Sequence, residues 1–345
     1  MNKDRAYYVR WAYELSSRED FTIKEGLWFP AYYDGLRVRS AIFDVIYNEE
    51  DAILKLYDDP RPTFEVTALK QFNQHNKSKI LVAPKFFKGK GLSSRKGWLL
   101  MEKIPEGHYP FSQPVAKDER ERLIDLFFEY RRNCPDSANR PLSLVEQLSA
   151  SEFHCFRINR WLALANEEEN KRLQTGKSMV LEPEEFIPRF KIALSYIKKR
   201  FFECEMLWSV KGLFQPSDIF SAPEKDICYL NDFCRSAMYP EGYEMSSLIW
   251  SDWMISANYH MSDKDWQKGL DEWIELFCEK VKKTEVFLPE FKDGLDRFRT
   301  LMKACLIERA LGSTLADITA NTKMPDEEKR ARLKNMYRLI DEIAS

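Results

Sequence analysis

Apolar residues recur at helical spacing over the C-terminal two thirds of the chain. From residue 119 onward, large apolar side chains repeat every three or four positions, which is the pattern of helices with one buried face. The stripes are Leu123, Phe127 and Tyr130; Phe186, Phe190, Leu194, Ile197 and Phe201; Trp266, Leu270, Trp273, Phe277 and Val281; and Leu333, Tyr337, Ile340 and Ala344. Residues 262–265 are typical of a capped start for the third of these helices. We therefore predict a large helical region with a shared core, rather than a cofactor site at these stripes.

The first third of the chain has a different pattern. Residues 4–16 predict a short amphipathic helix, packed through Tyr7, Val9, Trp11 and Leu15. Residues 40–47 and 52–57 are rich in branched and aromatic side chains, and the polar segment 48–51 between them predicts the turn of a hairpin. A helical pattern begins at 64–69, and residues 99–102 predict another strand. A small mixed region therefore precedes the helical one.

Length and composition narrow the class of protein. A chain of 345 residues exceeds what one hydrophobic core usually covers, so two lobes or domains are expected. Its 44% apolar content supports a packed interior, and its formal net charge of −2 favours neither nucleic acid nor an anionic membrane as a partner. The first twenty residues carry charges throughout and do not predict a secretory signal. We expect a soluble cytoplasmic protein.

Cysteine and histidine usage argues against a disulfide framework and a zinc site. The seven cysteines are scattered and never form a C-x-x-C motif, which is typical of reduced thiols. The four histidines have no ligand spacing. His154 and Cys155 are adjacent on a predicted helix, so their side chains diverge and do not form a catalytic pair.

One segment carries the strongest chemical signal. Residues 211–220 read K-G-L-F-Q-P-S-D-I-F, and residues 230–233 read L-N-D-F. Phosphoryl transfer requires a carboxylate near the attacking hydroxyl and oxygen ligands for Mg²⁺, and Asp218 and Asp232 could supply such ligands. The alternative is a proline-bearing loop with two unrelated acids.

The segment resembles the catalytic loop of the aminoglycoside phosphotransferase and choline kinase group, H-G-D-x-x-P-x-N, followed by an Asp-containing strand end. The frame of that loop is kept by Gly212, Phe214, Pro216 and Ile219. The resemblance implies that Asp218 and Asp232 are the metal ligands and that Lys211 replaces the histidine. It also implies that Leu213 stands where the proton-accepting aspartate is expected.

The resemblance extends to the mixed region. There it implies that Lys55 reaches the nucleotide phosphates and pairs with Glu65 on the next helix. It further implies that residues 99–107 are the hinge between lobes, where backbone groups of Glu102 and Ile104 bind an adenine and Met101 lines the pocket behind it. Read without the resemblance, Lys55 could be an edge-strand lysine with its ammonium in water, and Glu65 a first-turn acid favoured by the helix dipole.

Three segments fit the family less closely. The phosphate-covering loop should lie at residues 32–37, which hold a single glycine and so support close backbone approach to phosphate poorly. The basic stretch 85–96 could contact an anion, but a solvated hairpin tip accounts for it better. Residues 140–177 are expected to hold looser insertions, because 166–170 form a charged run.

A substrate site is expected after the metal-binding strand. In the family, cationic substrates lie against acids and aromatic rings of the helices there, which implies Glu241, Glu244, Trp250 and Trp253 in this sequence. The alternative reading is that these side chains fill a helical core.

The predicted fold is α+β, a protein-kinase-like two-lobe fold with an antiparallel sheet in a small N-lobe and a large, mainly helical C-lobe. We expect a helical extension at 1–25, the nucleotide-binding-type N-lobe at 26–103 and the C-lobe at 104–345, with the catalytic-type loop at 211–218 and the metal strand end at 230–233.

Two functions remain open. The first is a degenerate, pseudokinase-like module that binds a nucleotide, with Mg²⁺ and ATP or GTP, or a protein partner, because Leu213 replaces the base. The second is an active ATP-dependent phosphotransferase that acts on a small cationic or hydroxylated molecule without the usual base.

Overall fold

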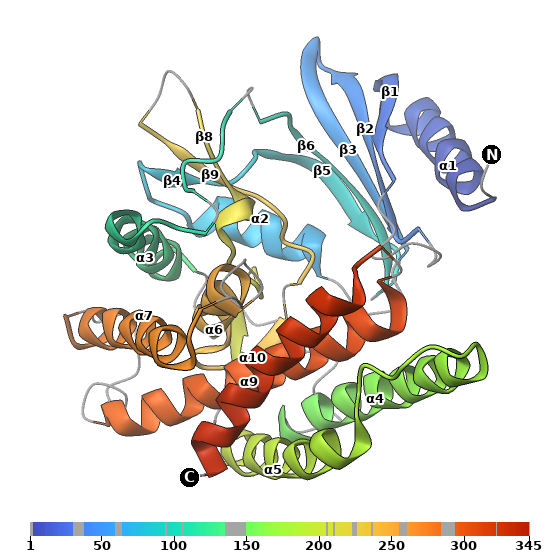
Figure 1. Cartoon of the computed structure of the whole chain (residues 1–345). Coiled ribbons are helices and arrows are strands. Elements are labelled where there is room, and N and C mark those ends of the chain that lie inside the picture. The colour runs from blue at the N-terminus through green and yellow to red at the C-terminus, as the bar shows by residue number, and fades with distance from the viewer. Residues whose placement is uncertain are drawn as a thin grey trace.

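A five-stranded antiparallel sheet forms the smaller of two lobes in the computed structural model of the chain. The structure describes residues 3–29, 38–58, 64–93, 95–104, 107–112, 114–134, 150–204, 206–209, 211–222, 226–235, 237–254, 261–283, 294–321 and 323–344. The strand order is β1-β2-β3-β6-β5, with bounds β1 Thr22–Trp28, β2 Ser40–Tyr47, β3 Glu50–Asp58, β5 Phe86–Gly91 and β6 Lys96–Glu102. Figure 1 shows this sheet above the helices α4, α5, α7, α9 and α10.

The predicted hairpin of β2 and β3 is confirmed. Tyr47 pairs with Glu50 at its tip, and the two residues between them, Asn48 and Glu49, have φ values of 51° and 66°. Two consecutive left-handed residues make the tight turn whose twist matches that of the flanking strands. The second strand begins two residues before the predicted start, because Glu50 and Asp51 pair in the ladder.

Helix α1 (Lys3–Glu19) packs on β1, β2 and β3 of the sheet. Its buried face is formed by Tyr8, Trp11, Ala12 and Leu15, which pack against apolar residues of β2, β3 and β6. The sequence correctly gave Trp11 and Leu15 but missed Tyr8, which is 1% exposed, while Tyr7 and Val9 are only partly buried. Tyr8, Trp11 and Leu15 follow the helical spacing that Tyr7 and Val9 break.

A second, three-stranded sheet joins the two parts of the chain. Its order is β4-β9-β8, where β4 (Leu81–Val82) follows α2 (Glu65–His75), and β8 (Ile219–Ser221) and β9 (Cys228–Leu230) follow the loop at 211–218. Strands β4 and β9 are parallel. The loop is therefore hydrogen-bonded, through its following strands, to the segment after α2.

The larger lobe is built on helix α9 (Leu295–Ala320). It contacts α4 (Ala150–Gln174), α5 (Pro183–Phe202), α6 (Tyr243–Ile249), α7 (Asp263–Lys283) and α10 (Asp326–Ala344), while α3 (Lys117–Arg132) lies near β4. A π-helical turn, η3 (Trp250–Met254), and two short paired strands, β7 (Met206–Ser209) and β10 (Ala237–Pro240), complete this lobe. Because α9 is buried on nearly all sides, its sequence shows no single apolar stripe and did not stand out.

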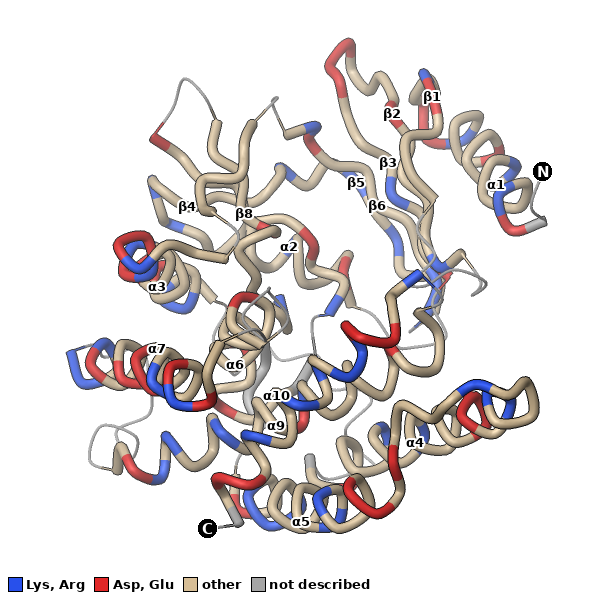
Figure 2. Tube along the Cα trace, in the orientation of Figure 1, with Lys and Arg blue, Asp and Glu red and all other residues tan. Residues whose placement is uncertain are grey.

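The predicted stripes are buried in this lobe. Those of α3 and α7 are buried at every position, and in α5 only Leu194 is partly exposed. In α10, Leu333 and Ile340 are buried and Tyr337 is partly buried. The predicted cap of α7 is also confirmed, because the amide of Asp265 donates to Ser262 Oγ at 3.2 Å. Among the described helices, none combines the length and apolar character needed to cross a bilayer. Figure 2 shows charges of both signs along α3, α5 and α7.

The expectation of a looser insertion around residues 166–170 is wrong. These residues belong to the continuous helix α4, and Glu169 within the run is 1% exposed. Glu169 Oε2 accepts a hydrogen bond of 2.7 Å from the amide of Val180, so it holds the connection to α5 instead of facing water. The part of the predicted insertion at 140–149 lies outside the described residues.

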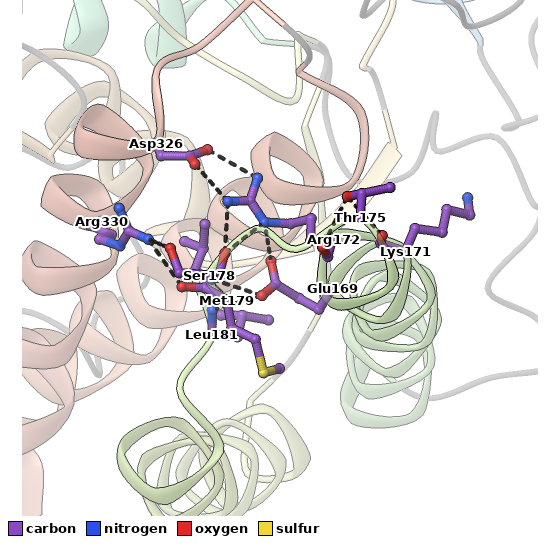
Figure 3. A network of polar contacts seen from close by, with 10 residues as sticks. Glu169, Lys171, Arg172, Thr175, Ser178, Met179, Leu181, Asp326 and Arg330 are labelled. Atoms are coloured by element: carbon purple, nitrogen blue, oxygen red, sulfur yellow. Dashed lines mark hydrogen bonds and ion pairs between the residues drawn. The ribbon is translucent and has the colours of Figure 1, made fainter.

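The segment that connects α4 to α5 also contacts the start of α10. Arg172 donates to Asp326 at the start of α10 with distances of 3.0 and 2.6 Å, and to the carbonyl of Ser178 (Figure 3). Arg330 donates to Ser178 Oγ and to the carbonyl of Met179. The end of α4, the loop after it and the start of α10 therefore form one polar cluster.

A buried carboxylate lies at the centre of the helical lobe. Glu308 of α9 is fully buried, and its Oε1 lies 2.7 Å from Nδ1 of His154 and accepts 2.9 Å from Nε of Arg157, both on α4. Its Oε2 accepts 2.9 Å from the hydroxyl of Tyr243 on α6. Burial opposes ionisation of Glu308, but Arg157 and His154 outweigh it and hold its pKa well below the usual range. His154, which had no predicted role, is thus part of a polar core.

Candidate functional site

Three elements bring ionisable side chains together where the lobes meet. Lys55 of β3 donates 2.6 Å to Oε1 of Glu65, the first residue of α2, and its Nζ lies 3.5 Å from Oδ1 of Asp232, just after β9. Burial would lower the pKa of Lys55, but the two carboxylates outweigh that and raise it, so the side chain stays charged. The residues implied by the resemblance are therefore adjacent in space; their role stays a prediction.

Lys211 is the second cation of the site and is enclosed by it. Its side chain is 1% exposed, and its Nζ lies 2.9 Å from Oδ2 of Asp218. The same ammonium donates 2.7 Å to the backbone carbonyl of Asp232. Lys211 therefore contacts both residues that the resemblance gives as metal ligands.

The two aspartates have different electrostatic surroundings. Burial raises the pKa of Asp218 to about 6, and the nearby Lys211 offsets this only in part. Burial acts in the same direction on Asp232, but Lys55 and Lys211 outweigh it and hold the pKa of Asp232 below its usual range. The side chain of Asp232 keeps 44% of its surface exposed, against 15% for Asp218, so Asp232 is the acid that faces outward.

The backbone of the loop is fixed from the C-lobe. The hydroxyl of Tyr130 accepts 2.9 Å from the amide of Lys211 and donates 2.6 Å to Oε1 of Glu244. Glu244 Oε1 also accepts from the amide of Gly212 at 2.9 Å, and Ser247 Oγ accepts from the amide of Phe214 at 2.9 Å. Buried amides are costly without partners, so α3 and α6 determine the path of the loop.

Leu213 gives this loop an apolar centre. Its side chain is 8% exposed and belongs to the main hydrophobic core, and neighbouring Phe214 is fully buried with its ring at 87° to that of Phe127. A leucine can neither accept a proton nor bind a cation. The position where the resemblance implies a general base is therefore occupied by a core residue.

Gly212 is required by the backbone at this point. Its φ is 80°, a conformation that residues with a side chain rarely adopt, and a Cβ there would overlap the carbonyl of Arg235. We expect Gly212→Ala to lower the free energy of unfolding by about 2–4 kcal/mol, because left-handed strain and a backbone clash add together. Urea denaturation would measure this. Gly176→Ala is the control, since Gly176 is also left-handed (φ 74°) but has open space around it. An equal loss in both variants would contradict the clash.

The predicted hinge lies at the end of β6. Met101 is 8% exposed, and the amide of Glu102 donates 2.9 Å to the carbonyl of Lys85 on the neighbouring segment. Oε2 of Glu102 accepts 2.9 Å from the amide of Lys85, and the hydroxyl of Tyr229 donates to Oε1 at 3.4 Å. The amide of Glu102 is therefore already hydrogen-bonded to Lys85. If Glu102 and Ile104 bind an adenine as predicted, Glu102 can contribute only its carbonyl oxygen.

The four residues predicted to contact a substrate are buried in the helical lobe. Glu241 and Glu244 are 6% and 3% exposed and both pair with Arg131, at 3.3 and 3.2 Å. Trp250 and Trp253 are also buried, each with an arginine over its ring, Arg309 and Arg120 respectively. The alternative reading as helical core fits this placement, and the acids support the loop instead of facing a ligand.

Sequence reasoning missed the residues that hold the loop. Tyr130 was read only as the end of an apolar stripe, and Arg131 and Ser247 were not singled out. The sequence signal was present in Arg131, because a cation directly after a buried stripe requires an acid partner in the fold. The expected phosphate-covering loop at 32–37 lies outside the described residues.

The Mg²⁺ site implied by the resemblance does not fit the residues as they are arranged. Mg²⁺ requires octahedral oxygen ligands, usually one or two carboxylates completed by water and phosphate. Of the two residues that the resemblance gives as ligands, Asp218 already has its Oδ2 at 2.9 Å from the ammonium of Lys211, and the same ammonium donates to the backbone carbonyl of Asp232.

Comparison with solved structures identifies the fold. The choline kinase LicA from Streptococcus pneumoniae superposes with a TM-score of 0.55 at 9% identity, covering 96% of this chain and 98% of that one. An apo thermostable mutant of the aminoglycoside phosphotransferase APH(4)-Ia gives 0.53 at 11% identity, with 96% and 98% covered. A Plasmodium vivax ethanolamine kinase gives 0.52 at 13%, with 92% and 81% covered. No protein-family model and no curated protein sequence matches the chain.

These similarities extend over nearly the whole chain, so the two-lobe arrangement as a whole is shared. The chain has the protein-kinase-like α+β fold of the aminoglycoside phosphotransferases and the choline and ethanolamine kinases. This agrees with the fold class expected from the sequence. Because identity is low, the likeness concerns the fold, and function must be argued from the site.

Proposed function

We propose that this chain is a kinase-fold protein that binds a nucleotide of the ATP or GTP type but does not transfer its phosphoryl group. The observation that carries the proposal is the core position of Leu213. General-base assistance contributes about 10² to 10⁴ in rate, and leucine supplies none. Meanwhile Lys55 contacts Glu65 at 2.6 Å, which supports the prediction that this lysine is the cation for the phosphates.

The fold supports a nucleotide as the ligand. One structure with this fold is a ternary complex of the aminoglycoside phosphotransferase APH(4)-Ia with ADP and hygromycin B, with a TM-score of 0.52. Lys55 and Asp232 come from the two parts of the chain that meet at the site, as an arrangement that clamps a ligand between lobes requires. A protein partner is the other ligand class compatible with a degenerate site.

Binding without turnover is the expected result for the native protein. Titration with ATP and GTP should raise the melting temperature, because a ligand that binds only the folded state stabilises it. Phosphate release measured on the same samples should stay at the level of a protein-free blank. No shift with either nucleotide at millimolar concentration would overturn nucleotide binding and leave a protein partner as the alternative.

An active phosphotransferase on a small cationic or hydroxylated molecule is the competing function. The arrangement of Lys55, Glu65 and Asp232 favours it, because a loose, metaphosphate-like transition state depends on positioning and charge more than on a base. Phosphate transfer that is abolished by Asp232→Ala would establish it. Transfer unaffected by that substitution would indicate a contaminant.

A further inference from the structure

The ammonium of Lys211 contacts the side chain of Asp218 and the backbone of Asp232. Its Nζ is 2.9 Å from Oδ2 of Asp218 and 2.7 Å from the backbone oxygen of Asp232. These are contacts that a positive charge makes when it is bound by oxygen ligands on two sides. This ammonium is part of a side chain, so the positive charge is present whatever the concentration of metal ions.

The charges of the site require Lys211 in this position. Five ionisable groups meet here: the cations Lys55 and Lys211 and the acids Glu65, Asp218 and Asp232. Lys55 is closest to Glu65, at 2.6 Å, and lies 3.5 Å from Asp232. Lys211 is therefore the near counter-charge of Asp218, and without it that mostly buried carboxylate would lack its ion pair.

Lys211 is also held where it is. Its side chain is 1% exposed, and its amide donates to the hydroxyl of Tyr130. The next residue, Gly212, is hydrogen-bonded to Glu244 and is in contact with the backbone of Arg235. An ammonium enclosed in this way cannot turn into solvent to make room for a metal ion without disrupting the loop.

We propose that Lys211 is a resident cation that replaces the divalent metal ion of this site, so that the site binds no Mg²⁺ of its own. For the nucleotide, which rests on the proposed function above, this means that binding does not depend on Mg²⁺. The carboxylate of Asp218 and the backbone carbonyl of Asp232 then serve to hold Lys211, and the carboxylate of Asp232 is the more exposed of the two, at 44% against 15%.

Metal binding to the apo protein tests the role of Lys211 without any nucleotide. Mn²⁺, which can replace Mg²⁺ at oxygen sites and is visible by electron paramagnetic resonance, is titrated into the native protein and into Lys211→Met. We expect no bound Mn²⁺ in the native protein and one bound ion per molecule in Lys211→Met, because the substitution removes the ammonium and leaves Oδ2 of Asp218 and the backbone oxygen of Asp232 available as oxygen ligands. Mn²⁺ binding by the native protein, or no gain in a folded Lys211→Met, would overturn the proposal.

Two variants serve as matched controls for this titration. Lys211→Arg keeps a cation at this position and should bind no Mn²⁺. Lys103→Met removes a lysine from another ion pair, with Asp44 at 2.7 Å, where a single carboxylate remains, and should bind none either. Mn²⁺ binding by Lys211→Arg equal to that of Lys211→Met would show that cation loss is not the cause.

A second measurement uses only the native protein and stays decisive if Lys211→Met does not fold. ADP affinity is measured by calorimetry in excess EDTA and in excess Mg²⁺. We expect the two dissociation constants to agree within about threefold, or less than about 1 kcal/mol. Binding at least tenfold tighter with Mg²⁺ would overturn metal independence while leaving the proposed nucleotide binding intact. Binding in neither condition would instead overturn the proposed function, and the Mn²⁺ titration would then decide the role of Lys211 alone.

Discussion

Glu308→Ala is expected to lower the free energy of unfolding by about 3–5 kcal/mol, the usual cost of breaking a buried ion pair by removing one partner. Glu308 is fully buried, and its two oxygens contact His154, Arg157 and Tyr243. Truncation would leave the guanidinium of Arg157 without its carboxylate and the tyrosine hydroxyl without an acceptor. Since α4, α6 and α9 all meet at this residue, the loss should destabilise the helical lobe as a whole.

Urea denaturation of Glu308→Ala against the native protein measures this loss. Glu275→Ala is the matched control, because Glu275 also forms a two-contact pair with an arginine, Arg299, at 2.7 Å for each contact, but is 52% exposed. Exposed pairs of this kind contribute about 0–1 kcal/mol. A loss below about 1 kcal/mol in Glu308→Ala, no larger than in the control, would mean that the buried cluster does not stabilise the lobe.

The double substitution Lys211→His with Leu213→Asp is expected to raise nucleotide hydrolysis by about 10² to 10⁴-fold over the native protein in the presence of Mg²⁺. The two changes supply different missing parts. Leu213→Asp provides a carboxylate that can accept a proton, and Lys211→His removes the ammonium that contacts Oδ2 of Asp218 and the backbone oxygen of Asp232. Each single variant should stay near the native level, because each leaves one part missing.

Phosphate release and melting temperature should be measured together for these variants. Leu213 lies in the hydrophobic core, and a carboxylate there is costly to bury, so a loss of stability must be separated from a lack of chemistry. Lys211→His with Leu213→Asn is the control, since asparagine has the shape of aspartate but cannot act as the base. Full activity in Leu213→Asp alone would show that Lys211 does not obstruct the site.

The sequence predicts a helix or strand of this protein well where one face of that element is buried and the other is polar. The hairpin of β2 and β3 and the stripes of α3, α5 and α7 are of this kind, since alternating or helical spacing is visible when the opposite face is polar. Helix α9 is surrounded by other helices, so its sequence shows no single apolar face, and the charged run at 166–170 of α4 indicates exposure that the fold does not have. Glu169 shows the reason: a carboxylate can be buried when backbone amides satisfy it.

The sequence could predict the site only through the order and spacing of its motifs along the chain. The adjacency of Lys55, Glu65 and Asp232 was implied by a resemblance in order and spacing, and the structure brings them together. The contact of Lys211 with both aspartates was not foreseen, because a lysine side chain has many rotamers and its direction depends on the enclosure built by α3 and α6. The buried position of Glu244 likewise depends on Arg131 and Tyr130, which lie far from it in sequence.

The contact of Lys55 with both Glu65 and Asp232 also bears on how fast a ligand could be captured. One ammonium links a strand and a helix of the small lobe to the segment after β9, so side chains of the chain itself join these elements. If the conformation that binds the ligand is the main one, a low population of that conformation does not reduce the apparent affinity. Binding then follows second-order kinetics without a slow closing step. Stopped-flow binding should then give a rate that rises linearly with ligand concentration and does not level off.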